Sequence, residues 1–311
     1  MSNKRDPIPA EIKRSVRQRC GFGCVMCGAP VFEYEHMAGY GVTGHDPDEM
    51  TLLCDKHHRE KTAGRLPVSI VRRANATPFN IARSLGSPHD IYFEGRSFTV
   101  SLGSNEFQCT EPTKEATAIE VDGEAILGIR FIEGCISLDI TIRDENDHIL
   151  FLVRGGELRH SVKTWDVTFE GRRLTVRRGP RDVVLALTLA PPDQIILETA
   201  EIWCRGIFIR VGKASRSGDG VEVVNNGASF SDHVFADFKT LFAVGDYLGL
   251  GGAALTIPIG QRWVGGVPAR PGTFSKNGGG QKFTYSDPLF MSSLCTPTLQ
   301  GSFLSDVHWG A

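Results

Sequence analysis

Hydrophobic and polar positions near the start of the chain alternate in short stretches that predict a small mixed α/β module. Pro9 in a first helical turn, with Ile12 and Val16 spaced by basic residues, predicts an amphipathic helix ending near Cys20-Gly21. We then expect a strand at 31–36, a glycine-bearing loop at 38–48, a short apolar segment at 50–53 and helices at 55–62 and 68–75. After the first helix, the predicted order is therefore a β-hairpin followed by helices.

From about residue 118 the pattern changes to short apolar runs separated by turn residues, as at 144–147 and 191–193. Regular spacing of such runs indicates all-β structure. No repeat unit is visible, so a sandwich and a stacked solenoid both remain open. The expected strands are 126–131, 136–142, 149–153, 165–169, 174–176, 183–189, 195–197 and 207–211.

These patterns predict an α+β chain with a small module at 1–77, a connector at 78–115 and a larger, mostly-β domain at 116–311. The last part is rich in glycine and serine. Its Gly249-Leu250-Gly251-Gly252 run is not a phosphate-binding loop, because no strand–turn–helix unit surrounds it and no Lys-Ser/Thr follows. We expect loop packing or an oligomer contact there.

Charge is distributed unevenly along the chain. The net charge is −2, yet the first 73 residues carry twelve Lys and Arg against a thinner set of acids. A locally basic module on a near-neutral chain favours contact with nucleic acid.

The cysteines are also concentrated in the N-terminal module, which holds four of the eight, at positions 20, 24, 27 and 54. No secretory segment follows Met1, and no apolar run is long enough to span a bilayer. We therefore expect a reducing cytoplasm, where clustered cysteines indicate a metal site rather than disulfides.

Two residue pairs have the spacing of a structural zinc site. Cys24-x2-Cys27 forms a tight turn, and Cys54-x2-His57 opens a predicted helix, whose i and i+3 positions share one face. Thiolates and imidazoles at such positions close a tetrahedral zinc site. Cys20 is an alternative ligand, but we expect it to pack under the first helix.

A Glu35-His36 pair between the two zinc half-sites, together with His58, predicts a second site. Neighbouring helical residues diverge by about 100°, so His58 turns away from the zinc if His57 faces it. A carboxylate and an imidazole can hold a divalent ion, and a free histidine nearby can act as a base near neutral pH. These are the parts that phosphodiester hydrolysis needs.

The combined motif resembles the zinc-containing HNH endonucleases, which have a ββα-metal fold. The resemblance rests on Cys24-x2-Cys27, Glu35-His36, Leu52-Leu53-Cys54-x2-His57-His58 and Lys61-Thr62, and covers about residues 8–66. It implies that His36 is the general base and that Glu35 and His58 hold a catalytic Mg²⁺ or Mn²⁺. The structural zinc ligands would be Cys24, Cys27, Cys54 and His57.

The sequence departs from the family at one notable position. Glu49 stands where the family usually has its central asparagine, which fixes the loop and orients the base. We include Glu49 in the catalytic set, because a carboxylate there either takes over this role or weakens activity. Arg59 and Lys61 on the expected site helix are candidate phosphate contacts, and His45 in the loop is interpreted as a solvated histidine.

The resemblance implies a metal-dependent endonuclease with DNA as the expected substrate and RNA as the alternative. Two-part chains of this kind are familiar among bacterial antiviral defence effectors and mobile-element enzymes. The β-rich region would then regulate the nuclease or hold it in a homo-oligomer. The alternative is a catalytically silent zinc module that binds nucleic acid, with the β domain as the working unit.

Overall fold

The computed structural model describes residues 6–213, 215, 218–225, 227–245, 253–257, 262–264 and 267–269. The chain forms two compact units. The N-terminal unit comprises Met1–His89 together with Arg159–Val183, and the β unit comprises Asp90–Leu158 and Val184–Ala311. The glycine runs at 249–252 and 278–280 lie outside the described residues.

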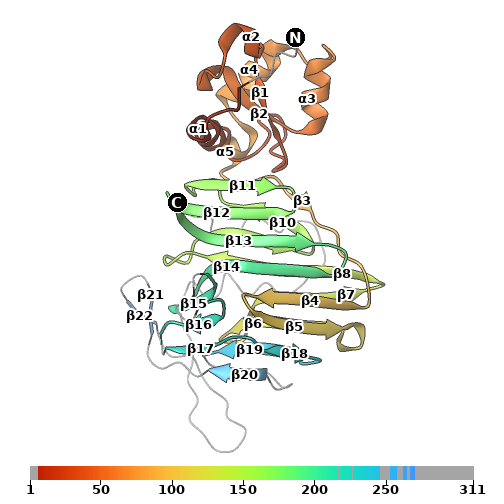
Figure 1. Ribbon diagram of the computed structural model, residues 1–311, viewed down its shortest axis with the longest axis vertical. Coiled ribbons are helices and arrows are strands. Elements are labelled where there is room, and N and C mark those ends of the chain that lie inside the picture. Colours follow the sequence, from red (N-terminus) through yellow and green to blue (C-terminus); the bar gives the residue numbers. More distant parts are fainter. Residues whose placement is uncertain are drawn as a thin grey trace, which may run out of the picture. The chain divides into compact units, whose positions relative to one another are not determined.

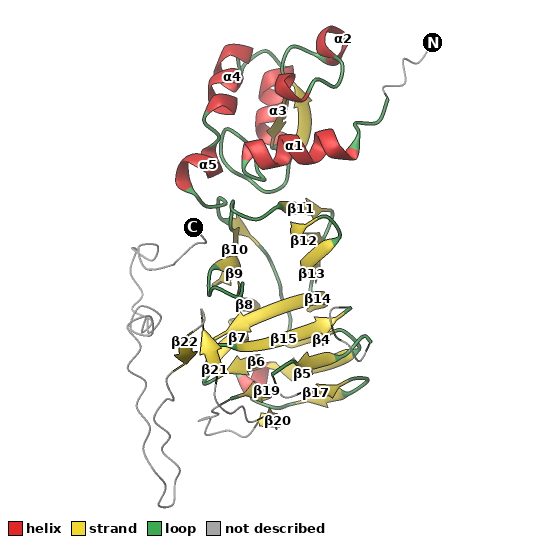
Figure 2. Cartoon of the chain, turned by 90° about the vertical axis from the view of Figure 1, so that its left-hand side faces the viewer, coloured by secondary structure: helices red, strands yellow, loops and turns green. Residues whose placement is uncertain are grey.

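The N-terminal unit contains the α-helices of the described chain, which are drawn in red in Figure 2. A two-stranded antiparallel hairpin lies among them, with Glu35 opposite Thr51 and His36 opposite Met50. The elements are α1 (Ala10–Cys20), β1 (Glu33–His36), α2 (Tyr40–Thr43), the 3-10 turn η1 (Pro47–Glu49), β2 (Met50–Leu53), α3 (Asp55–Thr62), α4 (Val68–Ala76) and α5 (Phe79–Arg83).

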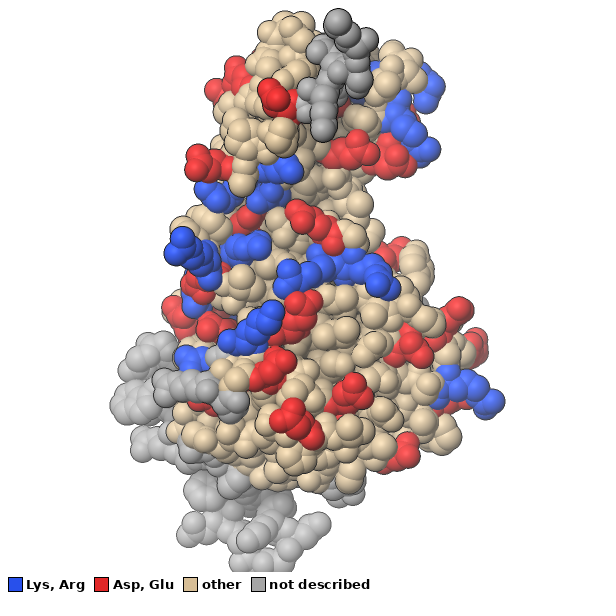
Figure 3. All heavy atoms as spheres, viewed as in Figure 1, with Lys and Arg blue, Asp and Glu red and all other residues tan. Residues whose placement is uncertain are grey.

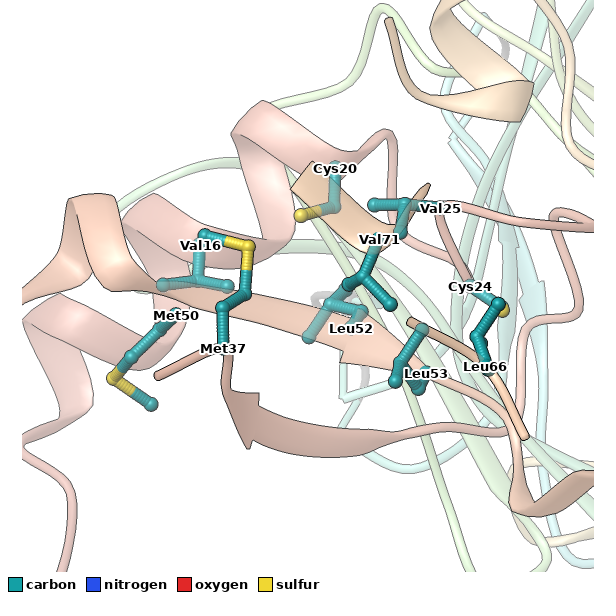
Figure 4. Packing of buried hydrophobic residues seen from close by; sticks show 10 residues of the cluster. All are labelled: Val16, Cys20, Cys24, Val25, Met37, Met50, Leu52, Leu53, Leu66 and Val71. Atoms are coloured by element: carbon teal, nitrogen blue, oxygen red, sulfur yellow. The ribbon is translucent and has the colours of Figure 1, made fainter. Parts of the chain in front are cut away.

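The core of this unit is built around β2, as Figure 4 shows. All four residues of β2 are buried, and Val16 and Cys20 of α1 and Val71 of α4 pack against it. This burial on both faces explains why three of its four residues are large and apolar, without a regular alternation with polar residues. Cys20 is fully buried in this core, as expected.

Helix α1 ends where the sequence predicts, for a steric reason. Gly21 follows it with a φ of 68°, in the left-handed region that glycine adopts at little cost, and its amide bonds back to the carbonyls of Arg17 and Gln18. A Cβ at Gly21 would stand only 3.0 Å from the Cβ of Asn80. The turn that leads to the first cysteine pair is therefore specified by this glycine.

The N-terminal unit also contains a second hairpin, from a distant part of the chain. Strands β11 (Asp166–Glu170) and β12 (Arg173–Gly179) pair antiparallel. Asp166 receives two hydrogen bonds from Arg17 of α1, Nε to Oδ1 at 2.8 Å and Nη2 to Oδ2 at 2.6 Å. Burial by itself lowers the pKa of Arg17, but its interactions with Asp166 and Tyr34 together outweigh burial and raise that pKa.

Asp166→Ala is expected to destabilise the N-terminal unit by about 3–5 kcal/mol, because it leaves the Arg17 guanidinium buried without its carboxylate. Urea unfolding followed by tryptophan fluorescence measures this. Asp182→Ala, which breaks the half-exposed Arg178–Asp182 pair, is the matched control and should cost at most about 1 kcal/mol. Equal losses of unfolding free energy in the two variants would show that the buried pair stabilises the unit no more than the half-exposed pair does.

The β unit is a multi-sheet structure built mainly from antiparallel neighbours. Strands β6 to β9 follow one another in one sheet, with β19 and β20 added in parallel at the β6 edge. In the other sheet β13 to β17 are adjacent in order, and β4 joins β14 in parallel. This mainly antiparallel order differs from that of a solenoid of parallel coils.

The bounds of the remaining strands are as follows (Figure 1). They are β3 (His89–Asp90), β4 (Ser97–Leu102), β5 (Asn105–Thr110), β6 (Glu115–Val121), β7 (Glu124–Ile132), β8 (Cys135–Arg143), β9 (Ile149–Arg154), β10 (Glu157–His160), β13 (Asp182–Ala190), β14 (Gln194–Cys204), β15 (Ile207–Gly212), β16 (Val221–Val223), β17 (Ala228–Phe230), β18 (Val234–Ala236), β19 (Thr240–Val244), β20 (Ala253–Ile257), β21 (Arg262–Val264) and β22 (Val267–Ala269).

Every strand expected between 126 and 211 is present, and the chain as a whole is mostly β. The segment 78–115, which its breaks identify as a connector, instead contributes α5 to the N-terminal unit and β4 and β5 to the β unit. Within the described residues, no helix has the length and apolar character needed to cross a membrane.

Candidate metal and active site

The four predicted zinc ligands converge at one point of the N-terminal unit. The ligand atoms of Cys24, Cys27, Cys54 and His57 all lie within 4.8 Å of one another. Cys27 Sγ lies 3.7 Å from Cys54 Sγ, and His57 Nδ1 lies 3.2 Å from Cys54 Sγ. Sulfur atoms bound to one tetrahedral zinc at 2.3 Å stand about 3.8 Å apart, so the cluster has the size of a zinc site.

The turn that carries Cys24 and Cys27 is fixed by backbone bonds and one buried side chain. Cys24 donates its amide to Ala29 O, and Gly28 donates to Cys24 O. Asn80 of α5 is fully buried and donates to the carbonyls of Gly21 and Gly28. Gly28 has a φ of 78°, and a Cβ there would collide with Asn80 Oδ1, so this position requires glycine.

The electrostatics of the cluster favour a metal-ready thiolate at Cys24. A hydrogen bond with the Cys27 thiol, helped by backbone amides in the turn, outweighs burial and lowers the pKa of Cys24. The pKa of the Cys27 thiol is raised, because Cys24 and Cys27 share one proton and burial disfavours a second negative charge. A cation between the sulfur atoms relieves that repulsion.

Helix α3 presents two different faces to two different groups of side chains. His57 turns towards the cysteines, and His58 turns towards β1, as the 100° step predicts. His58 Nε2 lies 2.9 Å from Glu35 Oε2, and His58 Nδ1 lies 3.4 Å from Glu33 Oε2. Glu33 and Glu35 are two apart on the strand, so both carboxylates point to the same side.

Lys61 of α3 belongs to this second group rather than to the surface. Its ammonium contacts Glu35 Oε1 and donates to His36 O at 3.1 Å, and its side chain is only 13% exposed. The sequence identifies Lys61 as a candidate phosphate contact, and the structure pairs its ammonium with Glu35. Arg59, by contrast, is largely exposed and pairs with Asp55 at 2.8 Å.

His36 forms a third group with residues of the following loop. His36 Nε2 lies 3.1 Å from His45 Nδ1, and the ring of Tyr40 stands edge-on to His36 at 5.3 Å. His45 Nε2 in turn lies 2.9 Å from Asp6 O. His45, interpreted from sequence as solvated, is therefore a contact of the expected base, and only the folding of the loop reveals this.

Adjacent residues of a regular strand point to opposite sides, so Glu35 and His36 can contribute to one site only if the strand ends or bends at this pair. Strand β1 ends at His36, where the chain turns: Gly39 donates to His36 O, and Met37 donates to Glu49 O. The end of the strand therefore lies at this pair. Within it, Glu35 faces α3 and His36 faces the loop.

Glu49 is held by an arginine from another helix. Both of its carboxylate oxygens accept bonds from Arg72 of α4, at 2.7 and 2.5 Å. The hydrogen bonds from Arg72 lower the pKa of Glu49. A bidentate pair of this kind orients the loop through charge and geometry, and nothing in the sequence spacing indicates Arg72 as the partner.

Comparisons with protein families, curated proteins and solved structures find no match to this chain.

Proposed function

We propose that the N-terminal unit is a metal-dependent endonuclease of the HNH type that hydrolyses DNA phosphodiester bonds. The main support for the proposal is that two adjacent residues of α3 contact two different groups of side chains. His57 completes the Cys₃His cluster, and the next residue, His58, contacts Glu35 on β1. The order β1, β2, α3 around that cluster agrees with a ββα-metal arrangement.

The donors around His58 suit a divalent ion. Glu35 and His58 would hold Mg²⁺ or Mn²⁺, with Glu33 as an additional carboxylate that lies outside the motif of the resemblance. Such an ion, when bound, polarises a phosphate and stabilises the leaving oxygen. Lys61 contributes a second positive charge beside Glu35, where charge develops on a transferring phosphate.

His36 has the role of general base in this proposal. It is 8% exposed and is held by the chain turn after β1, with His45 and Tyr40 beside its ring. A base must keep one orientation towards the water that it deprotonates, and contacts on two sides of the ring provide this. His45 is accordingly a positioning residue.

The β unit would regulate the nuclease or hold several copies together. A head with one metal and one base cuts one strand, so a homo-oligomer is the simplest route to a double-strand break. The second candidate function is a zinc module that binds nucleic acid without cutting it. Glu49 in place of the usual asparagine is the observation that favours this alternative.

Cleavage of supercoiled plasmid by the purified full-length chain tests the proposal. We expect nicking with added Mg²⁺ or Mn²⁺ and none when the added ion is left out. Omitting the ion is a better control than strong chelation, because chelators also extract structural zinc. A chain that binds plasmid with full zinc content yet never nicks it under either ion favours the silent binding module.

Glu49→Ala is expected to slow nicking by about 10-fold, because the carboxylate positions the loop through Arg72 and does not react. Glu49→Asn should keep most of the activity, and Arg72→Ala should resemble Glu49→Ala, since both break the same pair. Nicking rates at saturating metal measure the effect. A loss at Glu49 as large as the loss of the base, with Arg72→Ala harmless, would place the carboxylate in the chemistry instead.

A further inference from the structure

A basic segment of the N-terminal unit lies far from most of that unit's other residues in sequence. Residues 159–183 contain seven Lys or Arg against three Asp or Glu, a net charge of +4 in a chain whose net charge is −2. This segment folds with residues 1–89. On the face drawn in Figure 3, Lys and Arg side chains gather at the level of the β11–β12 hairpin.

The hairpin has one apolar side and one polar side. Val167, Leu174 and Val176 are buried on the apolar side. On the polar side Glu170 stands opposite Arg173, and Asp166 opposite Arg177. Burial of the first side fixes the pairing register and so determines which arginines share a face.

The acids of the segment do not neutralise all of its cations. Asp166 is buried and occupied by Arg17 of α1, and Asp182 is paired with Arg178. Lys163, Arg172 and Arg181 are exposed, and none of them forms an ion pair with any residue that the structure describes. Arg172 lies at the turn of the hairpin. Lys163 and Arg181 lie at its open end, just before β11 begins and just after β12 ends.

The hairpin is attached directly to the first helix of the nuclease module. Besides the Arg17–Asp166 pair, Gln18 Nε2 donates to Trp165 O at 2.6 Å, and the Arg14 guanidinium lies 4.7 Å from the centre of the Trp165 ring. Lys13 and Arg14 of α1 therefore belong to the same compact unit as the hairpin cations.

We propose that the β11–β12 hairpin, with its exposed cations, binds the phosphate backbone of double-stranded DNA without reading its sequence, and so delivers the duplex to the active site. This rests on the proposed nuclease function, whose substrate it specifies as a duplex. Arg172 stands at the turn of the hairpin and Lys163 and Arg181 stand beyond its open end, so these cations are separated by at least the roughly 14 Å that the five residues of β11 span, comparable with the roughly 12 Å width of a major groove. Cations at this spacing contact phosphates at separate points of one duplex.

The test compares two triple variants of the full-length chain that remove the same charge. Lys163, Arg172 and Arg181 are changed to serine in one, and Lys114, Arg96 and Arg154, three exposed cations of the β unit, in the other. Binding of a fluorescent 30-base-pair duplex is measured by anisotropy at several salt concentrations, with no divalent ion added. The hairpin triple should weaken binding at least about 10-fold and flatten the salt dependence by up to about three phosphate contacts. The control should change binding less than about 2-fold.

Each outcome separates this proposal from the nuclease itself. Equal weakening by the two triples, or no measurable binding of duplex by the unsubstituted chain, overturns the hairpin proposal even if plasmid is nicked. Tighter binding of single-stranded RNA that the hairpin triple abolishes also overturns it, since the partner is then not a duplex. Selective loss of duplex binding in a chain that never nicks supports the hairpin and contradicts the nuclease.

Discussion

Cys54→Ser is expected to release zinc and unfold the N-terminal unit, the largest stability effect that we predict for this chain. Zinc binding to closed cysteine–histidine sites is worth on the order of 10 kcal/mol in small domains, and that free energy contributes to folding. Cys54 is also the residue immediately before α3, so its position links the cluster to the helix that carries His57 and His58. Losing the cluster is therefore expected to disrupt the geometry of the proposed active site as well.

Zinc content by elemental analysis and urea unfolding together measure this effect. The unsubstituted chain should carry one zinc per molecule, and Cys54→Ser well under half of that. Cys135→Ser is the matched control, since Cys135 is exposed and lies outside the cluster. Full zinc content and unchanged unfolding in Cys54→Ser would show that the four side chains converge for another reason.

His36→Ala should reduce nicking of plasmid by about 10²- to 10⁴-fold, the range expected when a general base is removed. The imidazole is replaced by a methyl group that can neither accept a proton nor hold the water. Since His36 is not a member of the zinc cluster, the variant should retain its zinc and its unfolding midpoint within narrow limits. The loss is then one of chemistry and not of folding.

The measurement is single-turnover nicking with Mg²⁺ or Mn²⁺, and the control is His233→Ala, an exposed histidine of the β unit. His45→Asn is a useful companion, since it keeps a hydrogen-bonding group beside His36 and should retain far more activity than His45→Ala. If His36→Ala nicks at the original rate, His36 is not the base. If nicking is lost in His45→Ala but not in His36→Ala, then His45 is the base and His36 positions it.

Local patterns along the chain predict much of the fold. The helix at 55–62 and the segment at 50–53 have the bounds that the sequence predicts. Both depend on features within a few residues, namely side-chain period and the position of the second zinc pair. The convergence of the four metal ligands also follows from short spacings, because a C-x2-C turn and an i, i+3 helical pair each preorganise two ligands.

Contacts between distant segments could not be predicted in the same way. Arg17 and Asp166 are 149 residues apart, and neither lies in a pattern that distinguishes it from ordinary surface charge. The same holds for Asn80 behind the cysteine turn and for Arg72 at Glu49. A hydrogen bond between remote residues leaves no periodic signal, so these partners become visible only when the chain is folded.

The sequence by itself determined the four side chains of the candidate metal cluster, the helix on which His57 and His58 face different groups, and the β character of the larger unit, because each is encoded in short-range spacing. The tertiary structure decided which neighbours those groups have. It placed Lys61 against Glu35 and His45 against His36, and it brought the arginine-rich hairpin into the N-terminal unit. Side-chain packing and buried ion pairs fix these relations, and both depend on where remote segments meet in space.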